Sequence, residues 1–150
     1  DAYTAGLMHG LGLVAIDRHA AKQPKKIKLV SSGYPLDYAP AERAFLGGFS
    51  HVAVGGALLA MWGFSAAIVN AVTYQLSPED APEEHRPLSM ALATARWART
   101  LLCVKDEIIP ELPDPAWLAG AGIQPSEFDD WLSCVKMRYT IACGELRIAA

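Results

Sequence analysis

Cysteine is scarce in this chain of 150 residues. The three cysteines, Cys103, Cys134 and Cys143, are too few and too widely spaced for a Cys-x-x-Cys zinc site, and an odd number does not suggest a disulfide framework. We therefore expect reduced thiols in the core of a cytoplasmic protein. Basic residues are not in excess either, since 13 Lys and Arg against 16 Asp and Glu give a net charge of −3. Without a basic field, nucleic acid is not an expected direct partner.

Several motifs that mark enzyme classes are also missing. The chain has no Gly-x-x-x-x-Gly-Lys-Ser/Thr loop for phosphates, no Gly-x-Gly-x-x-Gly turn after a strand and no Gly-x-Ser-x-Gly elbow. Asp1-Ala2-Tyr3 lacks the charged start of a signal peptide. The chain opens within a helical pattern and without a methionine, so we expect the N-terminal part of the protein to lie upstream of Asp1.

Charge is absent from one long run. No Asp, Glu, Lys or Arg occurs from Ala44 to Pro78, a length that hydropathy alone would flag as a membrane span of about 20 residues. Paired glycines interrupt the run, and Ser50 and Ser65 are suitable N-caps for two short helices. We therefore expect two buried core helices and no membrane span, because a helix that is apolar all round suits the centre of a bundle.

The remaining pattern is helical along the whole chain. Apolar spacing and capping residues predict helices at about 2–18, 40–46, 50–62, 65–76, 87–104 and 126–146, and a shorter one capped by Asp114. Ser126 and Asp129 are expected to form the capping box of the last helix, and the prolines of 77–84 predict an exposed loop. The fold class is therefore all-α, a compact multi-helix bundle of one domain over 1–150, as a fragment of a larger helical domain.

Six segments form a recognisable series of motifs. They are Ala5-Gly6-Leu7-Met8-His9-Gly10-Leu11-Gly12, Glu42-Arg43-Ala44-Phe45-Leu46-Gly47, His51-Val52-Ala53-Val54-Gly55, Met61-Trp62-Gly63-Phe64-Ser65, Val72-Thr73-Tyr74-Gln75 and Asp114-Pro115-Ala116-Trp117-Leu118. This series resembles the HDOD domain, the HD-related output domain of bacterial signalling proteins, over nearly the whole chain. The resemblance implies an HD-like helical fold.

The same resemblance assigns positions to a former metal site. In the catalytic HD phosphohydrolases, to which HDOD domains are similar, histidines and aspartates hold a divalent metal that activates water. His9 stands at the histidine of the His-Asp pair, and Gly10 stands at its aspartate. His51 stands at a ligand position of two-metal members, while Tyr74 and Gln75 stand where a His-His pair is common.

The ligand set is therefore incomplete. The later aspartate would fall near Thr94 or Ala95, and neither supplies a carboxylate. A catalytic metal needs about three protein ligands and an open position, and hard divalent ions prefer carboxylate oxygens. Two imidazoles are a poor site, so we expect no bound metal, no cofactor and no catalytic residue.

Three functions stay open at this point. The first is a non-catalytic output module of a bacterial signalling protein, for example a response regulator with a receiver domain upstream. It would bind a signalling partner, or associate with itself, through helical surfaces. The second is a residual metal-dependent phosphohydrolase acting on nucleotides or cyclic dinucleotides. The third is a small-molecule sensor that uses His9, His51 and Gln75 as hydrogen-bonding groups.

Overall fold

The computed structural model describes residues 1–20, 42–43, 47–103 and 112–145. Every regular element in these residues is a helix, which confirms the all-α fold class. The α-helices are α1 (Ala2–Met8), α2 (Leu11–Ala20), α4 (His51–Met61), α5 (Ala66–Thr73), α6 (Arg86–Cys103), α7 (Pro115–Gly120) and α8 (Phe128–Glu145). Three 3₁₀ turns are η1 (Pro78–Asp80), η2 (Glu83–His85) and η3 (Pro125–Glu127). Of the helix expected at 40–46, Glu42 and Arg43 are helical and the other residues lie outside the described part.

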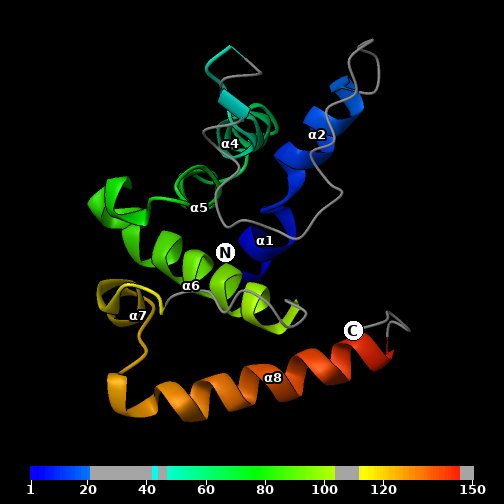
Figure 1. The fold of residues 1–150 in the computed structure, drawn as a ribbon. Helices are drawn as coiled ribbons and strands as arrows, with labels where there is room; N and C mark the ends of the chain where they lie inside the picture. Colours follow the sequence, from blue (N-terminus) through cyan, green and yellow to red (C-terminus); the bar gives the residue numbers. More distant parts are fainter. Residues whose placement is uncertain (21–41, 44–46, 104–111, 146–150) are drawn as a thin grey trace.

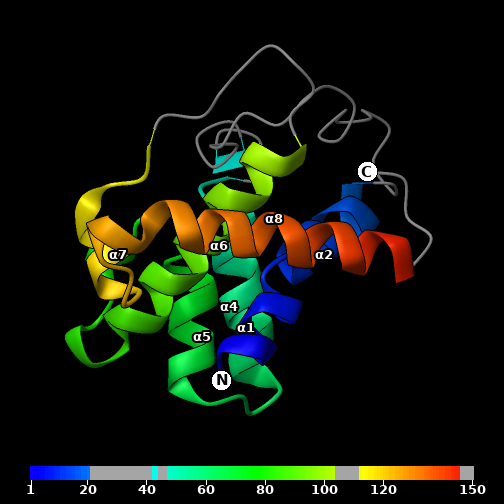
Figure 2. The same cartoon turned by 90° about the horizontal axis from the view of Figure 1, so that it is seen from below.

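The helices are stacked in layers (Figure 1). α2 and α4 pack together at one end, α5 and α1 lie next to them, and α6 follows. α8 lies on the far side of α6 (Figure 1). The view turned by 90° shows α8 running across α6 (Figure 2). None of the described helices is both long enough and apolar enough to cross a membrane.

The core is formed where α1, α4, α5 and α6 meet. Its buried members are apolar and are contributed by all four helices: Ala5, Leu59, Ile68, Ala71, Val72 and Leu92. α4 and α5 come from the uncharged run 44–78, and each contributes buried residues to the core as expected. Neither helix is buried all round, since Ala57, Ala60 and Met61 of α4 and Ala66 of α5 are exposed. Their lack of charge follows from this position, because an unpaired charge is costly to bury.

Glycine allows two of these helices to approach closely. A Cβ on Gly12 of α2 would overlap the carbonyl oxygen of His51, and one on Gly55 of α4 would lie 3.3 Å from the Gly12 nitrogen. Close helix packing therefore requires glycine at position 12. It does not explain Gly6 and Gly10, where a Cβ would meet nothing within 4 Å.

Three local expectations need correction. Segment 77–84 is exposed at Glu79, Asp80 and 82–84 as expected, but it forms η1 and most of η2 and buries Pro78 and Ala81, because η1 packs on α6. In the capping contact before α8, the backbone N–H of Gln124 donates to the Glu127 side chain. The N-cap therefore lies two residues before the expected Ser126, because a 3₁₀ turn precedes the helix. Cys134 is exposed on α8 and is not a core thiol. The cap expected at Asp114 is confirmed, since its Oδ1 accepts the Ala116 N–H at 2.7 Å.

Candidate functional site

His51 and Glu42 form a buried polar pair at the start of α4. The exposed fractions are 4% for His51 and 1% for Glu42. Glu42 Oε2 accepts the backbone N–H of His51 at 2.7 Å and lies 2.8 Å from His51 Nδ1. One carboxylate thus caps the helix N-terminus, where negative charge is favourable, and orients the ring. Because a carboxylate can only accept, Nδ1 of His51 carries the proton of this contact, and in the neutral ring Nε2 is an acceptor.

His9 lies at the end of α1, where the predicted first helix is interrupted. The Leu13 N–H bonds to the Gly10 carbonyl at 3.0 Å, although a continuous α-helix would direct it to the carbonyl of His9. The interruption frees that carbonyl for another donor. The ring Nδ1 lies 2.6 Å from the Gly6 carbonyl, which can only accept, so Nδ1 carries the proton and Nε2 is an acceptor.

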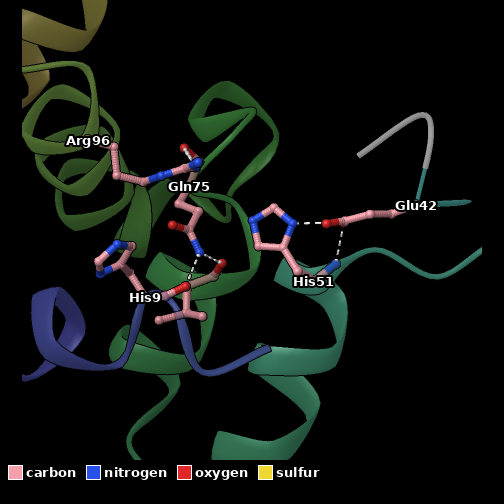
Figure 3. A network of polar contacts seen from close by, with 6 residues as sticks. His9, Glu42, His51, Gln75 and Arg96 are labelled. Carbon is pink, nitrogen blue, oxygen red and sulfur yellow. Dashed lines mark hydrogen bonds and ion pairs between the residues drawn. The ribbon is translucent and has the colours of Figure 1, made fainter. Parts of the chain in front are cut away.

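Gln75 supplies the missing donor. Its Nε2 donates to the His9 carbonyl at 3.0 Å and to the Val72 carbonyl at 2.9 Å, and its own carbonyl accepts from Arg96 of α6 at 3.4 Å. Figure 3 shows the Gln75 amide between the His9 and His51 rings, with the His51 ring between Gln75 and Glu42. Gln75 is 2% exposed, and its Oε1 has no hydrogen-bond partner within the described residues. The side-chain amide of Gln75 therefore ties the end of α1 to α5, and the backbone carbonyl of the same residue ties it to α6.

The other predicted positions do not join this cluster through a described contact. Gly10 has no side chain, and Tyr74 is the half-buried C-cap of α5, bonded through its backbone N–H to Asn70. Thr94 is buried in α6 with an unpartnered hydroxyl, and Ala95 is exposed. The structure thus brings together His9, His51 and Gln75 out of the predicted set.

Electrostatics at His9 favours the neutral ring. Burial lowers the pKa of His9 below its ordinary value, and the nearby Arg96 and Arg99 charges, together with His51, lower it further, whereas the hydrogen bond to Gly6 acts in the opposite direction. The same positive surroundings would repel a cation placed beside this ring.

These donors do not fit the divalent metal of the HD enzymes. The local donors are two imidazoles and one amide, while the Glu42 carboxylate is used on the far side of His51. Among the described residues, no group of three His, Cys, Asp or Glu side chains is placed to hold a metal ion. The groups that are present are engaged in hydrogen bonds: His9 with Gly6, His51 with Glu42, and Gln75 with the carbonyls of His9 and Val72.

Comparison with known proteins agrees with the motifs. A family model for the HDOD domain matches residues 1–78, more than half of the chain. The chain belongs to the HDOD domain family. An "Uncharacterized protein" of Treponema pallidum (strain Nichols) is 28% identical over 96 residues, which are 63% of this chain and 18% of that protein. No solved structure matches this HDOD chain.

The HDOD match contains every residue of the cluster except Arg96. HDOD domains are generally non-catalytic relatives of the HD enzymes and serve as HD-related output modules. Sequence reasoning placed Glu42 in a motif of the HDOD series but did not assign it to the site. The available signal was an acidic residue just before a long uncharged run that contains one histidine. Arg96 gave no comparable signal, because it is one of several basic residues of the chain.

Proposed function

We propose that this HDOD domain is a non-catalytic output module of a cytoplasmic bacterial signalling protein, such as a response regulator. The observation that carries the proposal is the use of the former ligand positions in internal hydrogen bonds. Gln75 binds the main chain of His9, and His51 is held by Glu42. Nothing in this set lowers the pKa of a water molecule or stabilises charge on a phosphoryl oxygen as a metal would.

The module would act through its helical surfaces. Large apolar side chains are exposed on α1 and at the end of α4: Tyr3, Leu7, Met61 and Trp62. Apolar side chains that are exposed together as one patch are typical of surfaces that bind another protein. We expect a signalling partner or a second copy of the chain as the binding species, controlled by a receiver domain elsewhere in the protein.

The first test is the metal content of the full-length protein, purified without a tag and without chelator, by elemental mass spectrometry. We expect manganese, iron and zinc well below one atom per chain. Near-stoichiometric metal would overturn the proposal and favour a residual phosphohydrolase acting on nucleotides or cyclic dinucleotides.

One observation favours small-molecule sensing as a second function. The buried Oε1 of Gln75 has no described donor, and the space where a Gly10 side chain would begin is open. A small molecule with an N–H or O–H group could bind Gln75 and the acceptor nitrogens of His9 and His51. This function requires thermal stabilisation by the ligand in the presence of chelator, and the stabilisation must be lost in Gln75→Leu.

A further inference from the structure

α8 forms the outermost layer of the described helices. The other labelled helices all lie on one side of it in Figure 1, and the turned view of Figure 2 shows it in front of them. It packs against α6 along that one side. The opposite side of this 18-residue helix faces outward.

The residues of α8 form three rows along the helix, at the spacing of three and four that places side chains on one face. The inner row is half-buried and contains Phe128, Trp131, Leu132, Val135, Tyr139 and Cys143. A polar row is exposed and contains Asp129, Ser133, Lys136 and Thr140. The outer row is also exposed and contains Asp130, Cys134, Met137, Arg138 and Ile141.

The outer row combines apolar side chains with two opposite charges. Met137 is 57% exposed and Ile141 is 52% exposed, although the neighbouring polar row is the side of α8 suited to water. Neither Asp130 nor Arg138 has an opposite charge three or four residues away along the helix. Neither forms an ion pair with another residue of the described chain.

The charges of the outer row are arranged symmetrically. Asp130 lies four residues before Cys134, and Arg138 lies four residues after it. A second α8 in the opposite direction, with Cys134 at the same height, therefore places Asp130 of each helix level with Arg138 of the other. A parallel pair would instead place like charges level with each other. The outer row is thus complementary to an antiparallel copy of itself.

We propose that the outer row of α8 is a dimer interface with a second copy of this chain. The two helices lie antiparallel about a two-fold axis at Cys134, since such an axis brings the same patch of both chains together. Two identical ion pairs form between Asp130 and Arg138, and Met137 and Ile141 are removed from water. The inference deepens the proposed function and rests on it, because it names the second copy as the binding species.

Sedimentation equilibrium of the full chain in the presence of reductant tests this interface. One pair of helices buries a small area, so we expect a weak and reversible monomer–dimer equilibrium at micromolar to millimolar concentrations. A chain that stays monomeric over this range would overturn the proposal. That result would leave the non-catalytic function intact, because metal content tests it separately.

Neutralising one acid distinguishes the outer row from the polar row. Asp130→Asn removes both ion pairs, so the dissociation constant of the dimer should rise by about fivefold. The matched control is Asp129→Asn, which removes a charge from the same turn of α8 but lies on the polar row, and it should change the constant little. Equal effects would contradict the assignment. Tighter association of Asp130→Asn would indicate a parallel pair and would also overturn it.

Charge reversal tests which side chains face each other. Asp130→Arg and Arg138→Asp each place like charges level, so each variant alone should be monomeric at concentrations where the native chain is dimeric. An equimolar mixture should associate, because the basic groups of one variant then meet the acidic groups of the other. A mixture that stays monomeric, or native association by either variant alone, would overturn the proposal.

A short bis-maleimide reports the position of the two-fold axis, because it joins two thiols without oxidation. It should link two native chains through Cys134, which is exposed. The linked dimer should be lost in Cys134→Ser and retained in Cys143→Ser, where the thiol removed belongs to the inner row. Linked dimer that persists in Cys134→Ser would place the interface elsewhere.

Discussion

His9 makes the stability of the protein sensitive to pH. Burial and the neighbouring Arg96, Arg99 and His51 lower its pKa in the folded state below the ordinary value of about 6.5. The unfolded chain therefore binds more protons than the folded chain as pH falls below about 6.5. The contribution of His9 to stability is complete above that pH and is lost as the pH falls toward the folded pKa and below it.

The check is urea unfolding of the native chain and of His9→Gln at several pH values between 5 and 8. We expect a smaller decrease in unfolding free energy on acidification in His9→Gln than in the native chain. NMR titration of the His9 ring should give a midpoint below that of a free histidine. A midpoint above it would contradict the prediction.

Glu42 stabilises the fold through two donors of His51. Removing the carboxylate in Glu42→Ala leaves the backbone N–H and the ring N–H of a buried residue without an acceptor. The free energy of unfolding should fall by about 2–4 kcal/mol. Glu42→Gln should lose less, because the amide oxygen can still accept.

Chemical denaturation measures this loss, and Glu79→Ala is the matched control because Glu79 is exposed on η1. We expect the control to change the stability little. If Glu42→Ala were as stable as the control, the pair would not stabilise the fold.

Helix packing gives opposite expectations for two neighbouring glycines. A Cβ on Gly12 would overlap the backbone oxygen of His51, so Gly12→Ala forces α2 and α4 apart and should cost about 1–3 kcal/mol. Gly10 has open space and no positive φ, so Gly10→Ala should be neutral or stabilise by up to about 1 kcal/mol. Thermal unfolding of the two variants side by side measures the difference. A larger loss at Gly10 than at Gly12 would contradict this account of α2 and α4.

α8 is expected to be the least stable of the long helices, because most of its residues are exposed or half-buried. Native-state hydrogen exchange should be slowest at Leu59 and Ala71 in the core and faster along α8. Phe128→Ala removes the ring between Trp97 and Trp131, so exchange in α8 should accelerate by about thirtyfold, the equivalent of about 2 kcal/mol.

Exchange at Leu59 and Ala71 provides the internal control for this variant. It should change much less than exchange in α8, because the core cluster is formed by α1, α4, α5 and α6. Equal acceleration in both places would mean that α8 unfolds together with the core.

Local patterns were sufficient to predict most of the helices. The uncharged run 44–78 predicted α4 and α5 as buried helices, because absence of charge and suitable caps are properties of short segments. The burial of Pro78 and Ala81 within segment 77–84 was not predicted, because it depends on the contact of η1 with α6. The interruption between α1 and α2 was also missed. A glycine within a helical pattern does not show whether the helix ends there, and the contact made at this break joins the His9 carbonyl to the distant Gln75 amide.

The sequence alone determined that this chain is helical and which side chains stand at the motif positions His9, His51 and Gln75, because both facts depend on residue type and short spacing. The tertiary structure decided which of these side chains lie together and what they bind. The Gln75 amide and the His9 carbonyl are 66 residues apart, and Glu42 and His51 are nine apart. Such bonds form only after the helices have packed, because their geometry depends on the relative positions of elements that no local pattern specifies.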